Sequence, residues 1–322
     1  MAATGQKPEF DRKLPDLTPE RRRLLRKLLS SVDAERGGRR PLAASSAPVS
    51  QDPELTFETD DPSKPESVKA MFRRFYNNVS KQLDSGPFGE FSYFLNYGYV
   101  PNLSPTESAI HLPSHYLNKN SVRLVLELVG KDSIDGRRVL DIGCGRGGTV
   151  HVLSTFFKPA SVTGLDLSTE AIAFCRRVHK ETNVYFQEGD AEALPFPPET
   201  VDLVTNVESS HSYPNIYRFF DGVYSVLAHG GRFLYTDVHA VEKHVEYATY
   251  LKSLGFVVES DRDITANVLL SCDEIAGSRV QAFSSGNAQS VMANFLAVPG
   301  SEVYESMKRR LWTYKITRFR KS

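Results

Sequence analysis

The sequence has few cysteines, no net charge and no long hydrophobic run. Its three cysteines, Cys144, Cys175 and Cys272, lie far apart in 322 residues, so the chain lacks both a disulfide framework and a C-x-x-C metal site. Its 39 basic and 39 acidic residues cancel, which removes the overall positive charge that attracts nucleic acid. No apolar run is long enough for a membrane span or a signal peptide. We therefore expect a cytoplasmic protein that binds neither nucleic acid nor membranes.

Short apolar segments alternate with helical patterns through most of the chain. This alternation predicts right-handed crossovers, and therefore an α/β fold whose mostly parallel sheet carries helices on both faces. Two later strands follow, and a helical insertion at 265–306 precedes the last of them. The predicted strands cover 138–142, 161–165, 184–187, 201–207, 232–237, 256–259 and 311–319.

The first 64 residues differ in composition from the rest and predict a linker. One short helix is expected within it, over 18–29, where Thr18 can act as N-cap and Pro19 as the first helical residue. From residue 65 the pattern is globular, with helices predicted over 66–83 and 113–130. We therefore predict a linker over 1–64 and one folded domain over 65–322.

The most informative motif is a glycine-rich loop directly after the first predicted strand. Gly143, Gly145 and Gly148 allow the backbone to turn sharply and to approach a ligand closely. They also satisfy the dinucleotide pattern G-x-G-x-x-G, so the glycines alone do not identify the ligand. Asp141 stands just before them, where its carboxylate would repel a pyrophosphate but suit a cationic amino group.

Two more aspartates follow at the ends of the next two strands. Asp166 ends the second strand, where it can accept hydrogen bonds from ribose hydroxyls. Asp190 follows the third strand, where it can meet an exocyclic amine such as that of adenine. Together with Asp141, these carboxylates suit one ligand that carries an ammonium, a ribose and an amino-purine. S-adenosylmethionine has these groups and no phosphate.

Residues 138–237 and the terminal strands resemble the class I S-adenosylmethionine-dependent methyltransferases. The resemblance implies a Rossmann-like, seven-stranded sheet of order 3-2-1-4-5-7-6 with an antiparallel last strand, helices over 65–130 that act as a lid, and S-adenosyl-L-homocysteine as product. It also implies that the insertion at 265–306, with Met292, Phe295 and Leu296, walls the substrate side. The cofactor-binding residues expected from motif and resemblance are Tyr76, Tyr97, Asp141, Gly143, Cys144, Gly145, Asp166, Leu167, Asp190, Ala191 and Asn206.

The segment after the fourth strand bears on the methyl acceptor. Methyltransferases of exocyclic nitrogens carry Asn/Asp-Pro-Pro-aromatic here, whereas this chain has Asn206, Val207 and Glu208. Glu208 and His211 would share one face if the segment is helical, so that His211 could take a proton from a hydroxyl while Glu208 orients its ring. His239 is the rival base.

A metal ion is not expected at the substrate. No adjacent pair of acidic residues follows the fourth strand, although the fold could still assemble Glu208, Asp237 and His239 into a site.

The same segment resembles O-methyltransferases of polyketides, including domains within modular polyketide synthases. That resemblance implies a catalytic pair of His211 and Glu208, acting on the β-hydroxyl of a chain carried by an acyl carrier protein. The pattern at 17–29 resembles connectors of such assembly lines, which implies neighbouring assembly-line domains as partners. Two alternatives stay open: a methyltransferase of a free small-molecule or lipid hydroxyl, and a non-enzymatic domain that binds the cofactor as an interaction module.

Overall fold

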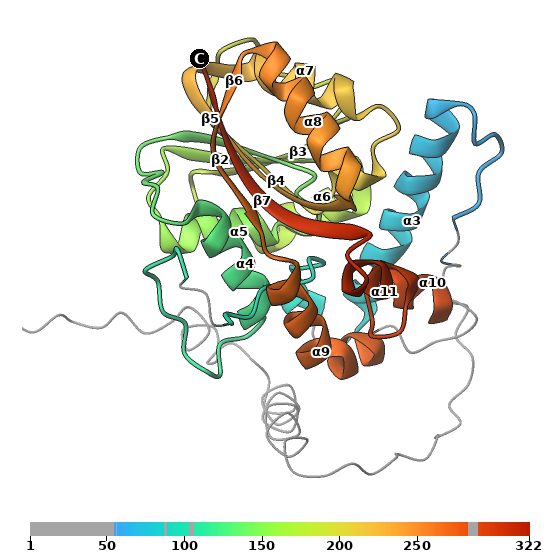
Figure 1. The fold of residues 1–322 in the computed structure, drawn as a ribbon. Coiled ribbons are helices and arrows are strands. Elements are labelled where there is room, and N and C mark those ends of the chain that lie inside the picture. The colour runs from blue at the N-terminus through green and yellow to red at the C-terminus, as the bar shows by residue number, and fades with distance from the viewer. Residues whose placement is uncertain (1–54, 56, 87–88, 103–105, 283–288) are drawn as a thin grey trace, which may run out of the picture. The chain divides into compact units, whose positions relative to one another are not determined.

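A computed structural model describes residues 55, 57–86, 89–102, 106–282 and 289–322 (Figure 1). The predicted helix at 18–29 and nearly all of the predicted linker lie outside these residues. The sheet, its helices and the cavity belong to the larger of two compact units, which consists of Asp52–Leu112 and Asn120–Ser322. Of the smaller unit, only Pro113–Lys119 is described.

Seven strands form one sheet in the order β3-β2-β1-β4-β5-β7-β6. The strands β1 to β5 pair in parallel, and β7 lies antiparallel between β5 and β6. This topology confirms the order that the resemblance implied. The strands are β1 (Arg138–Ile142), β2 (Ser161–Asp166), β3 (Val184–Glu188), β4 (Val201–Val207), β5 (Leu227–Ala240), β6 (Phe256–Asp263) and β7 (Trp312–Lys321).

Helices cover both faces of the sheet, as Figure 1 shows with α7 and α8 on one face and α4 and α5 on the other. Phe219 and Phe220 of α7 pack with Phe233 of β5 in the main hydrophobic core. The parallel pairing of Val207 with Thr236 places the carboxyl ends of β4 and β5 side by side. The helices after the first strand are α5 (Gly148–Phe156), α6 (Thr169–Val178), α7 (Ile216–Val226), α8 (Val241–Leu254), α9 (Thr265–Ala282), α10 (Gln289–Phe295) and α11 (Glu302–Lys308).

The two helices before the sheet are α3 (Pro65–Ser85) and α4 (Lys119–Val129), with a short 3-10 turn at Gly89–Phe91. The first lies close to its predicted position, with Pro65 at its first turn. The second begins six residues later than predicted, since Asn118 adopts a left-handed backbone (φ 55°) that an α-helix does not accommodate.

Apolar packing on α3 reaches upstream of Pro65. Leu55 is buried with Phe75 and Val79 of α3 and with Leu296 after α10, and Phe57 stacks on Phe75 at a ring-centroid distance of 4.2 Å. The segment before α3 and the insertion before β7 therefore belong to the same hydrophobic cluster.

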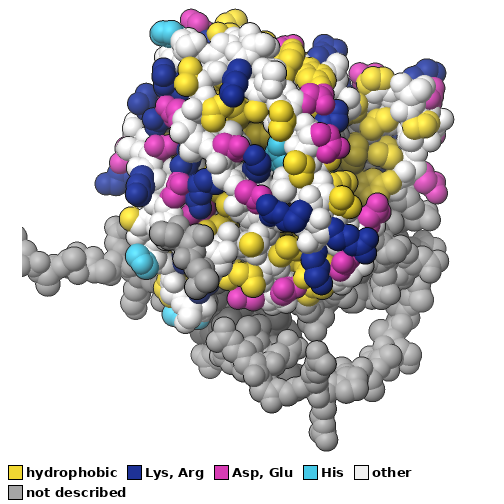
Figure 2. All heavy atoms as spheres, viewed as in Figure 1, with side chains coloured by type: hydrophobic (Ala, Val, Ile, Leu, Met, Phe, Trp, Pro, Cys, Tyr) yellow, Lys and Arg dark blue, Asp and Glu magenta, His cyan; other side chains and the backbone are white. Residues whose placement is uncertain are grey.

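The surface is mixed in charge. On the face shown in Figure 2, Lys and Arg side chains alternate with Asp and Glu, in keeping with the balanced composition. Among the described helices, none combines the length and the hydrophobicity that crossing a bilayer requires.

Candidate active site

The glycine loop joins β1 to α5 in a left-handed backbone conformation that residues other than glycine rarely adopt. Gly143 (φ 71°) and Gly145 (φ 52°) are both left-handed, and the backbone N–H groups of Gly143 and Cys144 donate to the carbonyl of Leu165. A Cβ on Gly143 would lie 2.2 Å from the hydroxyl of Ser209, whereas one on Gly145 would meet nothing within 4 Å. The loop therefore leaves open space above Gly145, which a ligand can fill.

A cavity that is open to solvent lies against this loop at the carboxyl ends of the strands. This is the edge where ligands bind in open parallel sheets. Helix α3 contributes Lys69, Phe72 and Tyr76 to its wall. Phe295 at the end of α10 also lines the cavity, and its ring lies 5.9 Å from that of Tyr76. Most of the predicted cofactor residues line the cavity: Tyr76, Tyr97, Gly143, Cys144, Gly145, Asp166, Leu167, Asp190 and Ala191.

The three predicted carboxylates occupy different environments. Asp166 lines the cavity and accepts hydrogen bonds from the backbone N–H groups of Gly145 (2.7 Å) and Ser168 (2.8 Å); burial nevertheless raises its pKa above the ordinary value. Asp190 also lines the cavity, where its Oδ2 pairs with Lys69 Nζ at 2.8 Å.

Asp141, also predicted at the cofactor, is not among the described residues that line the cavity, and its side chain is buried directly before the glycine loop. Its Oδ1 accepts from Thr205 Oγ1 at 2.7 Å, while its Oδ2 has no hydrogen-bond partner within the described structure. Burial raises the pKa of Asp141 to about 7. A cationic group nearby would hold this carboxyl ionised, because an opposite charge favours the charged form.

These residues fit S-adenosylmethionine. The open space above Gly145 admits a ligand next to the backbone, and Asp166 presents carboxylate oxygens at the cavity wall, as ribose hydroxyls require. The incompletely satisfied Asp141 suits an ammonium group. A phosphate-bearing dinucleotide suits this acidic surround less well.

Asn206 does not line the cavity, contrary to its prediction as a cofactor residue. Its side chain is fully buried, and its Nδ2 donates to the carbonyl of Ile142 (2.9 Å) and to Ser209 Oγ (2.7 Å). Asn206 therefore joins the end of β4 to the end of β1, directly before the glycine loop.

His211 lines the cavity and pairs with Asp237, not with Glu208. Its Nδ1 lies 2.7 Å from Asp237 Oδ1, and its backbone N–H donates to Oδ2 of the same carboxylate. Asp237 is fully buried, whereas the His211 side chain keeps 31% exposure. Because an ionised carboxylate only accepts, Nδ1 carries the proton, and Nε2 has the lone pair of a base.

The electrostatics of this pair favour opposite charges. Burial alone would lower the pKa of His211, but the neighbouring Asp237 carboxylate outweighs it and raises this pKa above 6.5. Burial likewise opposes ionisation of Asp237, yet the attractions to His211 and His239 hold its pKa well below the ordinary value. Asp237 is therefore ionised at neutral pH and stabilises a protonated His211.

The predicted pair of Glu208 and His211 needs a correction, because the chain does not form a helix across both residues. The 3-10 turn covers only Ser210–Ser212, and Glu208 has a left-handed backbone (φ 48°). The carboxylate of Glu208 instead accepts from the backbone N–H of Tyr97 and from the hydroxyl of Tyr314. Both Glu208 and His211 still line the cavity.

His239 lies behind the pair. It is 8% exposed, and its Nε2 lies 2.7 Å from the Tyr235 hydroxyl. Burial lowers its pKa to about 4, so it is neutral at physiological pH. The described residues that line the cavity do not include His239, so the geometry favours His211 as the base.

Lys69 was not predicted as a site residue. It lies 2.8 Å from both Asp190 and Glu192 and so holds α3 against the loop after β3. The spacing of Lys69 could have identified it, because Lys69, Phe72 and Tyr76 fall on one face of a helix. Of these three residues, only Tyr76 was predicted to contact the cofactor.

Comparisons with known proteins identify the family of this chain. The model of the methyltransferase domain family matches residues 140–235. A fatty-acid O-methyltransferase of Mycolicibacterium smegmatis is 34% identical over 225 residues, which are 69% of this chain and 81% of that protein. A phthiotriol/phenolphthiotriol dimycocerosates methyltransferase of Mycobacterium tuberculosis is 37% identical over 203 residues, which are 63% and 73% of the two chains.

A solved structure shows the same fold. Geranyl diphosphate C-methyltransferase from Streptomyces coelicolor A3(2), in complex with Mg²⁺, geranyl diphosphate and S-adenosyl-L-homocysteine, has a TM-score of 0.56 at 18% identity, over 81% of this chain and 100% of that one. The sheet order, the acidic glycine-loop cavity and the identity to these relatives lead to one assignment. The chain belongs to the class I S-adenosylmethionine-dependent methyltransferases.

Proposed function

We propose that this enzyme transfers a methyl group from S-adenosylmethionine to a hydroxyl oxygen of a lipid. The observation that carries the proposal is the pair of His211 and Asp237, which presents a base to a cavity walled by the aromatic residues Phe72, Tyr76 and Phe295. A base in an apolar wall suits an acceptor that is hydrophobic and weakly acidic.

Different residues of the protein would hold the cofactor and act on the acceptor. The bound cofactor supplies an electrophilic methyl group on a sulfonium centre. Asp166 and the open glycine loop would hold its ribose side, and Asp141 its ammonium end. Much of the rate then comes from holding the acceptor oxygen in line with the methyl carbon.

Proton removal is the task of His211. When the methyl group is transferred and S-adenosyl-L-homocysteine leaves, Nε2 of His211 would take the proton of the acceptor hydroxyl, and Asp237 would stabilise the imidazolium that forms. Ser210 fixes the carboxylate in turn, because its hydroxyl donates to Asp237 Oδ2 at 2.6 Å.

The pair favours a hydroxyl over a carboxyl acceptor. A fatty-acid carboxyl group is already ionised at neutral pH, so its methylation needs no general base. A hydroxyl must lose its proton while the new bond forms. The names of the two mycobacterial relatives describe action on a fatty acid and on phthiotriol lipids, which supports the lipid class of the acceptor.

Delivery on an acyl carrier protein, expected from the polyketide resemblance, stays a prediction, and so do assembly-line neighbours. The names of the two mycobacterial relatives mention lipids and no carrier protein. We therefore place a free lipid hydroxyl ahead of the carrier-bound β-hydroxyl.

The test is a comparison of three acceptors that share one chain length. The first is a 3-hydroxy fatty acid whose carboxyl is blocked as its methyl ester, the second is the same fatty acid without the hydroxyl and with a free carboxyl, and the third is the 3-hydroxyacyl chain on an acyl carrier protein. Mass spectrometry would detect the added methyl group, and S-adenosyl-L-homocysteine would be quantified in parallel.

We expect methylation of the blocked hydroxy ester and none of the unhydroxylated acid. Methylation of the unhydroxylated acid alone would contradict the hydroxyl proposal. Turnover of only the carrier-bound chain would replace the free lipid by the carrier-bound substrate.

A further inference from the structure

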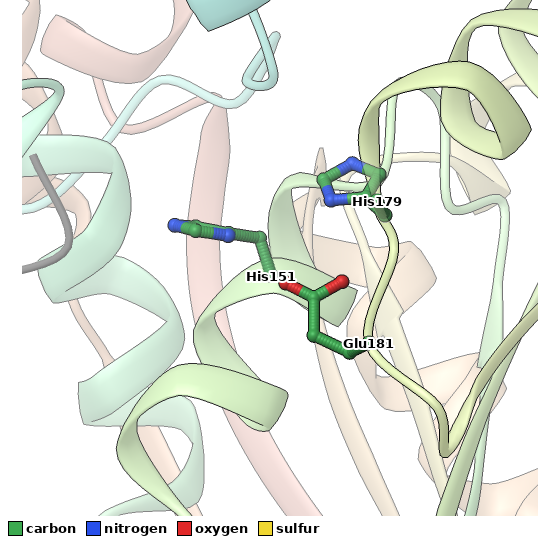
Figure 3. A group of neighbouring side chains, drawn as sticks. All are labelled: His151, His179 and Glu181. Carbon is green, nitrogen blue, oxygen red and sulfur yellow. The ribbon is translucent and has the colours of Figure 1, made fainter. Parts of the chain in front are cut away.

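A second group of ionisable side chains lies beside the glycine loop, where the ring of His179 packs on Gly147. His151 comes from α5, His179 caps the end of α6, and Glu181 follows in the next loop (Figure 3). One potential ligand atom from each residue lies within 4.8 Å of the others. None of these residues has a part in the proposed methyl transfer.

The hydrogen bonding of His179 defines which of its nitrogens can bind a ligand. Its Nε2 lies 3.2 Å from the backbone carbonyl oxygen of Arg146. A carbonyl oxygen only accepts, so Nε2 carries the proton, and in the neutral ring Nδ1 has the lone pair. Metal-binding histidines show this arrangement, with the second ring nitrogen donating to a backbone carbonyl.

Glu181 supplies an oxygen that lacks a partner. Its Oε2 is buried and has no hydrogen bond within the described structure. A buried carboxylate oxygen without a donor is costly, and a bound cation would remove that cost. Aromatic rings pack against the histidines: the ring of Tyr93 lies 5.0 Å from those of both His151 and His179, and the ring of Phe186 lies 5.3 Å from that of His179.

We propose that His151, His179 and Glu181 bind one divalent transition-metal ion of the zinc class. Two imidazoles and a carboxylate suit zinc, whereas Mg²⁺ and Ca²⁺ prefer sites made of oxygen ligands. Ligand atoms around a tetrahedral zinc lie roughly 3.3–3.4 Å apart. A modest inward rotation of these side chains, starting from a spread of 4.8 Å, completes the site.

The position of the site gives it a structural role. A Cβ on Gly147 would lie 2.6 Å from His179 Nε2, so the His179 ring packs directly on the glycine loop. His151 lies in the helix that begins at this loop. An ion held by these ligands joins α5 to the end of α6 and stabilises the glycine loop between them.

The test uses the full chain without a histidine tag, stripped of metal with a chelator. Co²⁺ is titrated into it and followed by visible absorption, because Co²⁺ at a tetrahedral zinc site gives intense ligand-field bands. We expect one equivalent of Co²⁺ to bind, Zn²⁺ to displace it, and Mg²⁺ to leave it in place. Zn²⁺ should also raise the Tm of the stripped protein, as a ligand of the folded state does.

Two ligand variants and one control identify the site. Glu181→Gln and His151→Gln should each weaken Co²⁺ binding by more than about 100-fold, since even the partners behind a metal's ligands are worth 10–100-fold. His229→Gln, at an exposed histidine on β5, should bind Co²⁺ as the unchanged protein does. Absence of the bands in the unchanged protein, or their survival in Glu181→Gln, would overturn the proposal.

Discussion

Asp237 is the residue that gives the proposed base its orientation and its charge partner. Replacing it by asparagine keeps the shape but removes the negative charge that stabilises the imidazolium of His211. We expect Asp237→Asn to lower turnover by about 10²–10⁴-fold, within the range of general-base catalysis, and His211→Ala to do the same. Glu208→Gln should cost less, because Glu208 bonds to Tyr97 and Tyr314 instead.

Steady-state turnover with saturating cofactor measures these effects. The double variant of His211 and Asp237 should be scarcely worse than either single variant, because a carboxylate without its histidine has nothing to orient. If Glu208→Gln lowered turnover as much as Asp237→Asn, the result would support Glu208, and not Asp237, as the catalytic partner of His211.

The pH dependence of turnover follows from the same contact. His211 works as a base only in its neutral form, so the rate should rise with pH through the pKa of His211. Asp237 raises that pKa above 6.5, and the midpoint of the wild-type profile should accordingly lie above 6.5. Asp237→Asn should move the midpoint to lower pH. A wild-type profile that is flat between pH 5 and pH 9 would show that proton removal by His211 does not limit turnover.

Asp166 is the residue on which cofactor affinity should depend most directly. Asp166→Ala removes the acceptors for ribose hydroxyls and the bond that holds Gly145 N–H. Hydrogen bonds to charged groups contribute about 1.5–3 kcal/mol, so S-adenosyl-L-homocysteine should bind at least about tenfold more weakly in calorimetry. Asp202→Ala is the control, because Asp202 pairs with Arg138 at the opposite ends of the strands. Unchanged affinity in Asp166→Ala would remove this residue from the site.

At the scale of elements, Arg146 links the glycine loop to α3. Its guanidinium is 1% exposed and donates to the carbonyls of Ser80, Gly89 and Ser92, and it pairs with Asp84. Arg146→Met removes these charge-assisted hydrogen bonds, which contribute about 1.5–3 kcal/mol each. We expect a loss of about 3 kcal/mol or more in the free energy of unfolding.

A loss of that size corresponds to a fall in Tm of roughly 6–12 °C, at about 2–4 °C per kcal/mol for a domain of this size. Arg177→Met is a matched control, because Arg177 pairs with the same Asp84 but keeps 55% side-chain exposure, and exposed pairs contribute little. Equal Tm values for the two variants would mean that Arg146 does not hold α3 to the loop.

At the scale of the whole molecule, two truncations locate the start of the folded part. A chain that begins at Asp52 keeps Leu55 and Phe57, whereas one that begins at Pro65 loses both from the cluster on α3. Full burial of a side chain such as Leu55, which is 3% exposed, contributes about 1.5–3 kcal/mol, whereas Phe57 keeps 42% exposure and contributes less. The chain from Pro65 should therefore have a Tm several degrees below that of the chain from Asp52. Equal Tm values would support the predicted boundary at residue 65.

Much of this fold can be predicted from the sequence because its signals are local. Short segments carry each of these signals: the alternation of strands and helices, the glycines of the loop, and the aspartates near the ends of the first three strands. They predicted the core of every strand, and the cavity contains the predicted Asp166 and Asp190. The start of α4 was missed because the left-handed conformation of Asn118 is not encoded by helical spacing.

The sequence by itself determined the individual strands, the glycine loop and a histidine after the fourth strand, since each depends on neighbours along the chain. Only the tertiary structure decided that Asp237 on β5, and not Glu208, faces His211. Spacing along a chain predicts a contact only where the backbone is regular, and the backbone at Glu208 is left-handed. Where the backbone is irregular, the partner of a side chain depends on which strand lies next to it in the sheet. His211 follows β4, and β5, which carries Asp237, lies next to β4.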